Sequence, residues 1–561
     1  MGEQSVGARI ADLVRAEGIE TIFSICDVSY NEVHRRAIEI GLRVVGPRHE
    51  AAGVHMADGL ARVTGRPGVV MAGMGPGVAN LLPGVVCAAT ENVPVVVIAT
   101  QRTRSTASAV RRGRFQYSPQ LRLFEPATKY AAVVEGAHRV DEVVHEAFRR
   151  ATTGTPGPVY VEVPQDVVLE RRVFAPPRPP ERYRLGPQEA VQARVEEAAD
   201  WLRAARLPLL VPGTAVHQAR AHGELRRVAE ILRCPVVPTP GGRGSLPETH
   251  PQTLLFLGPG AEACAAADCV LAVGTSIGES FAFGGPPLFG DPAEQRWILA
   301  ERDPSAVGVN REIDLALVGD LRAVLAQLAA ALEKRGPFAA LPRLSAWREQ
   351  QDNLRKWLAS SAPETEPIHP ARAVLEVRAV VPDDAVLVRD GGSTGLWEAV
   401  FDEQRSTEFL WTSKFGHLGT GLPYALAAQL AVRRERRVCL VTGDSALGFY
   451  TMELETAVRH GLPVLVVVNY DQHWGMEHAG QIQDIGRLVE CRHAPVRLDE
   501  LARALGAHGE RCTRSDEIRP AVERALASGK PALVQIVTDA RVNAYEAPGL
   551  AEFAKWYEGA Y

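Results

Sequence analysis

Two short acidic motifs stand near opposite ends of this 561-residue sequence. Glu50 follows an apolar segment in the run Pro47-Arg48-His49-Glu50, so a lone carboxylate comes directly after an expected strand. Gly443-Asp444-Ser445 ends the apolar strand expected over residues 437–442 with a tight, acidic turn. Carboxylate oxygens are ligands that Mg²⁺ prefers, so this turn suits a metal-bound diphosphate. The two motifs together predict the two ends of one cofactor site.

The elements that must position these motifs are short Val, Ile and Leu runs that alternate with amphipathic helical stretches. Continuous apolar runs are typical of strands buried on both faces, and helices between them supply the crossovers of parallel sheets. Strands are expected at residues 68–71, 93–99, 159–163, 208–211, 270–273, 385–388, 438–441, 464–468 and 532–536. The fold class is therefore α/β, with three tandem domains whose parallel sheets are flanked by helices.

Two proline-rich, charged breaks divide the chain, at residues 175–180 and 333–370. Proline lacks a backbone donor and is a poor core element, so both breaks are predicted to be linkers. The predicted domains are residues 1–174, 185–332 and 370–540, followed by a tail at 541–561. The tail is aromatic and amphipathic; it is expected either to close over an active site as a lid or to pack at a subunit contact.

Composition points to a small-molecule enzyme. A net charge of −5, with both signs interspersed, gives no electrostatic reason to expect nucleic acid or a membrane surface as partner. No apolar stretch approaches the roughly 18 residues of a membrane span. The eight cysteines are scattered and contain no CxxC pair, which favours a reduced, cytoplasmic location.

With these blocks placed, the motif order resembles the thiamine diphosphate-dependent decarboxylases and carboligases. That family includes acetolactate synthase, oxalyl-CoA decarboxylase and 2-hydroxyacyl-CoA lyase. The motifs that carry the resemblance are Arg48-His49-Glu50, residues 75–80, 154–159 and 416–423, and Gly443-Asp444-Ser445-Ala446 with Gly448-Phe449. The resemblance implies a pyrimidine-binding domain, a middle domain and a diphosphate-binding domain, in that order.

By this resemblance, Glu50 is the catalytic acid. Thiamine becomes a nucleophile when C2 of its thiazolium ring loses a proton, which the cofactor's aminopyrimidine removes once a hydrogen bond at N1′ favours the imino tautomer. Glu50 is expected to make that hydrogen bond, and Leu418 is expected to wedge the two cofactor rings together. The alternatives are a first-turn acid favoured by the helix dipole for Glu50 and an ordinary core residue for Leu418.

The resemblance also implies a Mg²⁺ site. Asp444 is the first expected ligand, and Asp471 takes the place of the family's second asparagine, with the backbone carbonyl of His473 completing the protein ligands. Asn469 is the ligand instead if the loop shifts by two residues. In a purely structural interpretation, residues 469–471 form a strand-end turn and the cofactor site is degenerate.

Further cofactor contacts follow from similarity. Gly443 and Ser445 flank the metal aspartate, and Ser393 and Thr394 follow a strand in a loop whose hydroxyls and amides can approach phosphate oxygens. The alternative for Ser393 and Thr394 is that they cap the next helix. Ser445 replaces the family's commoner glycine and resembles the CoA-dependent members.

Four residues are candidates to face substrate. Gln116 is expected to polarise a carbonyl, and Glu477 and His478 are expected to relay protons. Asp27 either faces substrate or caps the helix that begins near Ser29. The alternative for Gln116 is a polar loop residue, and for Glu477 and His478 it is a solvated helix start.

The resemblance leaves the middle-domain ligand open between CoA or ADP, flavin and an empty site. It implies a homodimer or homotetramer. The first function hypothesis is a 2-hydroxyacyl-CoA lyase that releases an aldehyde or ketone plus formyl-CoA. The alternatives are a 2-oxo acid decarboxylase or acetolactate synthase-like carboligase, and a thiamine diphosphate-binding protein without turnover.

Overall fold

The computed structural model describes residues 2–108, 110, 112–336, 338–548 and 550. They form two compact units. Unit 1 comprises the described residues up to Gly186, together with Lys414–Arg433 and Tyr450–Leu462. Unit 2 comprises Pro187–Ser413, Arg434–Phe449 and the described residues from Pro463 onward.

Unit 1 is built on a six-stranded parallel sheet with the order β3-β2-β4-β5-β7-β6. Its strands are β2 (Thr21–Ser24), β3 (Arg43–Val45), β4 (Gly68–Ala72), β5 (Val95–Gln101), β6 (Ala131–Val133) and β7 (Val159–Pro164). Strands β1 (Gln4–Ser5) and β8 (Arg171–Arg172) form a separate two-stranded antiparallel sheet.

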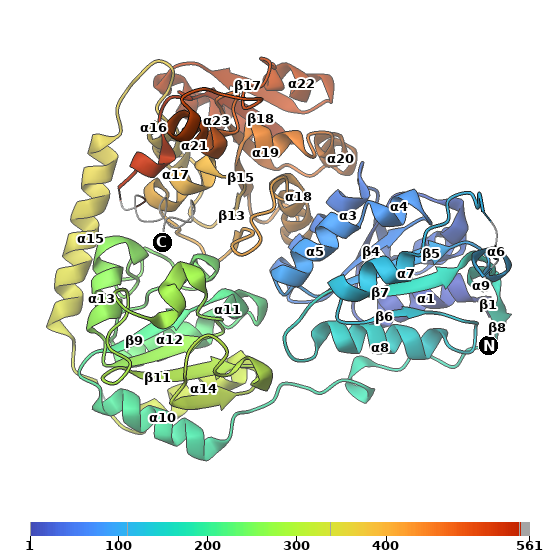
Figure 1. The fold of residues 1–561 in the computed structure, drawn as a ribbon, viewed down its shortest axis with the longest axis horizontal. Coiled ribbons are helices and arrows are strands. Elements are labelled where there is room, and N and C mark those ends of the chain that lie inside the picture. The colour runs from blue at the N-terminus through green and yellow to red at the C-terminus, as the bar shows by residue number, and fades with distance from the viewer. Residues whose placement is uncertain (1, 109, 111, 337, 549, 551–561) are drawn as a thin grey trace. The chain divides into compact units, whose positions relative to one another are not determined.

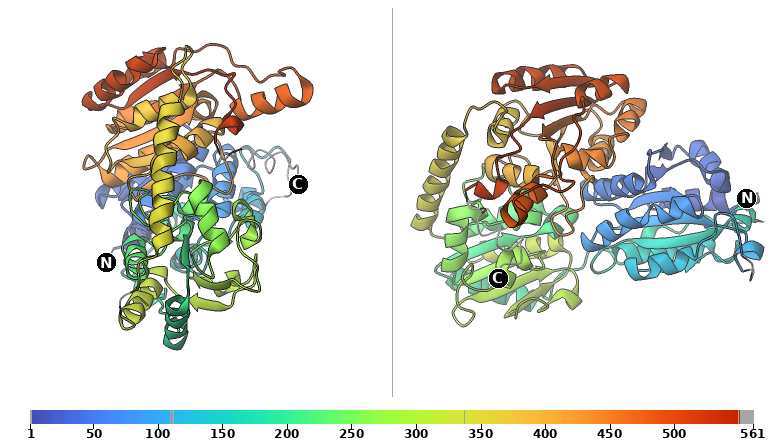
Figure 2. Two further views of the ribbon diagram at one scale, coloured as in Figure 1. Left: turned by 90° about the vertical axis from the view of Figure 1, so that its left-hand side faces the viewer. Right: turned by 45° about the horizontal axis from the view of Figure 1, so that its top comes forward.

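Helices cover both faces of this sheet (Figures 1 and 2). The apolar faces of α1 (Val6–Ala16), α2 (Asn31–Glu39) and α8 (Val140–Thr152) share one buried cluster with alternate residues of β4, β5 and β7. Helix α3 (Glu50–Thr64) packs against β2 and β4 and against α5 (Leu82–Thr90). The shorter helices are α4 (Pro76–Ala79), α6 (Arg104–Ala107), α7 (Gln120–Phe124) and α9 (Gln165–Leu169).

Two helices from late in the sequence also belong to unit 1. Helix α18 (Gly421–Val432) packs closely along α3. Helix α20 (Glu453–His460) lies in the segment Tyr450–Leu462, which also belongs to unit 1. Because α18 is apolar on all sides, burial rather than amphipathicity accounts for its sequence.

Unit 2 contains two parallel sheets. The first has the order β12-β11-β10-β9 and consists of β9 (Pro208–Pro212), β10 (Cys269–Val273), β11 (Arg296–Glu301) and β12 (Leu315–Val318). The helices of this part are α10 (Gln192–Ala204), α11 (Thr214–Gln218), α12 (His222–Leu232), α13 (Ala261–Ala266) and α14 (Leu321–Glu333). Helices α10, α12 and α14 bury one face of the sheet.

The second sheet of unit 2 has the order β14-β13-β15-β16-β18-β17 and is also parallel. Its strands are β13 (Val386–Arg389), β14 (Phe409–Leu410), β15 (Val438–Gly443), β16 (Leu465–Tyr470), β17 (His508–Cys512) and β18 (Ala532–Val537). The accompanying helices are α16 (Pro370–Arg378), α17 (Ser393–Phe401), α19 (Asp444–Gly448), α21 (Gly475–Ile485), α22 (Leu498–Ala504) and α23 (Ile518–Ala527).

The predicted fold class is confirmed: three main sheets are parallel and carry helices on their faces. Within the second predicted linker, residues 342–361 form α15 (Pro342–Ser361), the long yellow helix of Figure 2. Buried Trp347, Gln351 and Leu358 anchor this helix, so spaced core contacts outweigh the local proline and charge content. The domain boundaries themselves stay predictions.

The described part of the tail packs inside unit 2. Ala544, Ala547 and Leu550 are buried in a cluster with α16 and α17. The predicted lid falls largely on residues 549 and 551–561, which lie outside the described residues. Across the described helices, none has both the length and the apolarity to cross a bilayer.

Candidate active site

Glu50 is the first residue of α3 and is half-buried. His49 caps this helix, because its Nδ1 accepts a hydrogen bond of 3.1 Å from the backbone N–H of Ala51. One carboxylate oxygen of Glu50, Oε2, accepts a hydrogen bond of 3.0 Å from Nδ2 of Asn80. The other, Oε1, faces Gly77, where a Cβ atom would lie 3.2 Å away. The helix start therefore presents one carboxylate oxygen beside a glycine.

The loop of residues 75–80 is fixed by a hydrogen bond to a buried side chain. Gly75 has φ +70°, a conformation that favours glycine, and its N–H donates to Oε1 of the buried Gln120 at 2.7 Å. A Cβ on Gly75 would come within 2.5 Å of the carbonyl oxygen of Gln116. The backbone of Gln116 therefore lies beside the glycine loop, although the residue as a whole is exposed to solvent.

Leu418 lies in unit 1 with Glu50 and is half-buried. Its carbonyl oxygen is 2.7 Å from Nδ1 of His417, and the His417 ring packs 4.8 Å from the ring of His55. His55 is fully buried, neither ring nitrogen has a hydrogen-bond partner among the described residues, and burial holds its pKa well below the usual range. The wedge role of Leu418 stays a prediction.

The structure answers one of the two alternatives for Asp27. Its Oδ1 accepts a hydrogen bond of 2.8 Å from the N–H of Ser29, so Asp27 caps the short helix at Val28–Tyr30. Its Oδ2 lies over Gly73, where a Cβ would be only 2.1 Å away. The capping interpretation is confirmed, and the carboxylate also fills the space above the end of β4.

In unit 2, the two predicted metal carboxylates lie at the carboxyl ends of neighbouring parallel strands, where α/β sheets bind ligands. Strands β15 and β16 pair so that Gly443 is opposite Asn469, which brings Asp444 and Asp471 into adjacent loops. Oδ2 of Asp444 accepts from the N–H of Gln472 at 2.8 Å, and Oδ1 of Asp471 accepts from the N–H of His473 at 2.8 Å. The Asp444–Gln472 bond joins the two loops, and the Asp471–His473 bond lies within the second loop.

Both carboxylates have raised pKa values. Burial raises the pKa of Asp444, and burial together with the charge of Asp444 raises the pKa of Asp471 to about 7. Two half-buried like charges disfavour each other's ionisation, and a bound cation would relieve that repulsion.

The third predicted ligand, the carbonyl oxygen of His473, is fixed by a hydrogen bond to the acidic turn. It accepts a hydrogen bond of 2.8 Å from Oγ of Ser445, whose hydroxyl also lies 3.0 Å from Nε2 of His493. Sequence reasoning did not find His493; it comes from a segment whose backbone pairs with the metal loop, and no motif marks it. Ser445 therefore connects the acidic turn to the loop of the second carboxylate.

Ser393 and Thr394 open α17, close to these carboxylates. A Cβ on Gly475 would lie 2.6 Å from Oγ of Ser393 and 3.3 Å from Oδ2 of Asp471, and a Cβ on Gly443 would lie 3.2 Å from Oγ1 of Thr394. Gly391 has φ +98°. Gly475 and Gly443 therefore lie against the side chains of Ser393, Asp471 and Thr394, and a larger residue at either glycine would crowd them.

The remaining candidates in unit 2 are arranged differently. Glu477 is exposed in the first turn of α21. His478 is half-buried, its ring lies 4.9 Å from that of His473, and burial lowers its pKa. Asn469, the alternative ligand, is buried in β16 with its Nδ2 unpartnered among the described residues. Their roles stay predictions.

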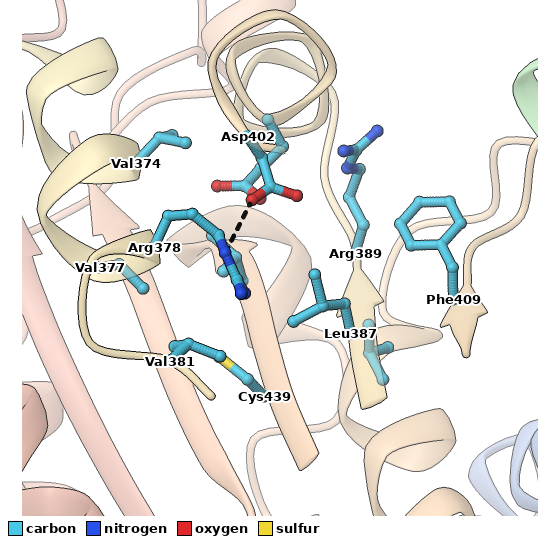
Figure 3. A pocket seen from close by; sticks show the side chains of 12 residues that line it. Val374, Val377, Arg378, Val381, Leu387, Arg389, Asp402, Phe409 and Cys439 are labelled. Atoms are coloured by element: carbon cyan, nitrogen blue, oxygen red, sulfur yellow. Dashed lines mark ion pairs between the residues drawn. The ribbon is translucent and has the colours of Figure 1, made fainter. Parts of the chain in front are cut away.

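A small cavity lies between α16, α17 and the strands β13 and β15 (Figure 3). Its volume is about 20 Å³, which is room for roughly one water molecule. Arg378 lies 4.0 Å from Asp402 across it, and burial raises the pKa of the lining Glu398 to about 8. The cavity is too small for a substrate, so its charges are structural.

In the predicted middle domain, residues at the strand ends are closely packed or cap short helices. A Cβ on Gly213 would lie 2.4 Å from Cβ of Thr275, and Asp303 caps a short helix by accepting from the N–H of Ser305 at 3.0 Å. CoA, ADP or flavin binding there stays a prediction.

The residues fit a divalent ion that holds a diphosphate. Asp444, Asp471 and the His473 carbonyl supply oxygen atoms from two loops that are hydrogen-bonded to each other, and the glycines at 391, 443 and 475 leave a cradle that a Cβ would fill. Within the described ranges, no cluster of three or more His, Cys, Asp or Glu side chains could hold a metal, so this set depends on the carbonyl.

Comparisons with known proteins agree with this geometry. Residues 4–123, 195–328 and 390–536 match the N-terminal TPP binding domain, the central domain and the C-terminal TPP binding domain of thiamine pyrophosphate enzymes. The acetolactate synthase large subunit IlvG of Mycobacterium tuberculosis is 32% identical over 541 residues, covering 96% of both chains.

Relatives with other names match over similar lengths. 2-Hydroxyacyl-CoA lyase 1 of Mus musculus is 28% identical over 562 residues, covering 96% of this chain and 94% of its own. Sulfoacetaldehyde acetyltransferase of Alcaligenes xylosoxydans xylosoxydans is 28% identical over 564 residues, covering 93% and 91%. Since all three domain models and full-length relatives match, this chain belongs to the thiamine diphosphate-dependent, acetolactate synthase-like enzyme family.

Proposed function

We propose that this enzyme is a thiamine diphosphate- and Mg²⁺-dependent carboligase that acts on 2-oxo acids, in the manner of an acetolactate synthase. The relative of that name is 32% identical to this chain, whereas the 2-hydroxyacyl-CoA lyase is 28% identical, so the carboligase takes precedence over the lyase that the motifs alone favour. The observation that carries the cofactor assignment is the half-buried pair Asp444 and Asp471, tied to the His473 carbonyl in one loop cluster.

The proposed roles follow from this geometry. Asp444, Asp471 and the carbonyl of His473 would hold Mg²⁺, and Ser393 and Thr394 would approach the diphosphate oxygens. Glu50 would exchange a proton at its free Oε1, while Asn80 holds Oε2. Bound thiamine diphosphate supplies a carbon nucleophile that adds to a carbonyl and takes up the electrons released when a carbon–carbon bond breaks.

The proposed reaction is balanced. With pyruvate as the simplest case, two 2-oxo acid anions and one proton give one 2-hydroxy-2-methyl-3-oxo acid anion and CO₂. One carbon–carbon bond to the departing carboxylate breaks, and one forms to the second carbonyl, with the proton ending on the new hydroxyl.

The test is a product assay on purified enzyme with Mg²⁺ and thiamine diphosphate. CO₂ and the hydroxy-oxo acid are expected in equal amounts from pyruvate, alone or with a second 2-oxo acid. Glu50→Gln is the matched variant: turnover should disappear while cofactor binding by calorimetry persists. A wild-type enzyme that binds cofactor but consumes no 2-oxo acid would remove the proposal.

The 2-hydroxyacyl-CoA lyase is kept as a second candidate because of Ser445. The Gly443-Asp444-Ser445-Ala446 sequence resembles the CoA-dependent members, and the Ser445 hydroxyl donates to the His473 carbonyl. The same enzyme preparation, given a 2-hydroxyacyl-CoA, would then release formyl-CoA and an aldehyde or ketone. Formyl-CoA in place of CO₂ would reverse the order of the two candidates.

A further inference from the structure

A buried carboxylate grips the backbone directly before Glu50. Glu453, the first residue of α20, is 1% exposed. Its Oε1 accepts hydrogen bonds from two consecutive backbone N–H groups, that of Arg48 at 2.8 Å and that of His49 at 3.2 Å. Its Oε2 accepts from Oγ1 of Thr456 at 2.7 Å. All of these residues belong to unit 1.

The same helix holds the other end of that loop. One guanidinium nitrogen of Arg459 donates to the carbonyl oxygen of Gly46 at 2.6 Å, and a carboxylate oxygen of Glu455 lies 4.0 Å from Arg48. The rings of His49 and Tyr450 lie 5.6 Å apart. The segment of residues 46–49 is therefore fixed at both ends by side chains from residues 450–462.

The buried carboxylate of Glu453 and the two backbone N–H groups satisfy each other's need for hydrogen bonds. Burying a carboxylate is costly unless hydrogen bonds replace its lost hydration, and three donors do so for Glu453. The backbone N–H groups of Arg48 and His49 in turn depend on this acceptor, because they stand ahead of α3 and outside its own hydrogen-bonding pattern. Any movement of Glu453 would therefore move the residue that precedes Glu50.

We propose that Glu453 is a positioning residue for Glu50: it fixes the backbone of residues 48 and 49 so that the Glu50 carboxylate stands at the cofactor with one oxygen free. The inference deepens the proposed function and depends on the role given there to Glu50. Glu453 acts only through the backbone and touches neither substrate nor cofactor.

The first measurement is amide hydrogen exchange in the enzyme without substrate. Glu453→Ala should speed exchange of the Arg48 and His49 amides by about tenfold or more, since each loses its acceptor. It should also lower kcat by about tenfold or more, while KM for the substrate and the dissociation constant of thiamine diphosphate change little. Glu453→Gln keeps an oxygen acceptor and should restore both readouts to within about threefold of wild type.

Glu17→Ala is the matched control. Glu17 is another buried carboxylate of unit 1, and it bonds to Tyr183 and Arg184 rather than to the segment before Glu50. Its replacement should destabilise the protein without changing exchange at residues 48 and 49. If Glu453→Ala does not fold, Glu453→Asp serves instead, because it withdraws the acceptor by one methylene and should show the same two changes.

Unchanged exchange at residues 48 and 49 in Glu453→Ala or Glu453→Asp overturns the inference, as does equal loss of kcat in the Glu17 control. A wild-type enzyme that turns over no 2-oxo acid overturns the proposed function instead. The two failures are separable, because hydrogen exchange is measured without turnover.

Discussion

The amide nitrogen of Asn80 donates a hydrogen bond of 3.0 Å to Oε2 of Glu50. A carboxylate has two equivalent oxygens, and this bond distinguishes them. The remaining oxygen, Oε1, faces Gly77, where even a Cβ atom would stand 3.2 Å away. Asn80 and Gly77 together therefore determine which oxygen of Glu50 is available to a bound ring nitrogen.

Asn80→Ala should lower kcat by roughly tenfold and leave the cofactor's dissociation constant within a few-fold. A hydrogen bond to a charged group contributes about 1.5–3 kcal/mol, and the partial exposure of this pair favours the lower end of that range. Steady-state kinetics at saturating cofactor measure the effect. Thr90→Ala, at an exposed position of the same unit, is the control and should leave kcat unchanged. An Asn80→Ala enzyme as fast as wild type would show that Glu50 needs no such support.

Replacements of Asp444 and Asp471 should separate the loss of a metal ligand from the loss of a negative charge. Asp471→Asn keeps an oxygen ligand and removes the repulsion from Asp444, so Mg²⁺-dependent cofactor binding should persist. Asp471→Ala and Asp444→Ala each remove a ligand and should weaken that binding by about tenfold or more. Calorimetric titration with thiamine diphosphate, before and after removal of Mg²⁺ by a chelator, measures this. Cofactor binding that survives the chelator undiminished would contradict the metal site.

Much of the fold follows from apolar runs in the sequence. All nine strands that these Val, Ile and Leu runs predict are present with shifts of a few residues. The strands that escaped prediction include β14 and β8, which have two residues each and are too short to stand out. Helix α15, inside the second predicted linker, does not stand out because its buried residues are widely spaced among charges.

The site was predictable where a motif carries it, and less so elsewhere. Asp444 and Asp471 lie in adjacent loops because adjacent parallel strands end at one edge, and their role as metal ligands with His473 stays a prediction. Asn80, Gln120 and Glu453 were not assigned roles, because their partners are distant in sequence and are often backbone atoms. Only Asn80 left a signal, as the polar residue that closes the glycine motif. The homo-oligomer and the cytoplasmic location stay predictions.

Gly475→Ala should weaken cofactor binding, because the new methyl group would stand 2.6 Å from Oγ of Ser393 and 3.3 Å from Oδ2 of Asp471. Both side chains would have to move, and both are assigned to the diphosphate and its metal. We expect the dissociation constant of thiamine diphosphate to rise about tenfold by calorimetry, in line with a strain of about 1–3 kcal/mol.

Gly480→Ala is the matched control in the same helix, since no described atom lies within 4 Å of its Cβ position. Alanine is the better helix former, so this variant should unfold at a slightly higher temperature and bind cofactor as wild type does. Equal cofactor affinity in the two variants would mean that the cofactor does not use the Gly475 cradle.

The stability of the protein should depend on pH through Glu453. Burial is the main cause that raises its pKa from 4.5 to about 7, against the opposing effects of Thr456, the Arg48 and His49 amides and Arg459. A raised pKa means that the folded state holds the proton more tightly than the unfolded state. The contribution is therefore fully present below about pH 4.5 and is lost as the pH rises through 7. Glu453→Gln has no proton to lose, so its free energy of unfolding relative to wild type should rise between pH 5 and pH 8 by on the order of 3 kcal/mol. Urea unfolding at the two pH values measures this difference, in which the other titrating groups cancel. Parallel pH dependences for the two proteins would show that Glu453 is ionised throughout, and that its hydrogen bonds to Arg48 and His49 outweigh its burial.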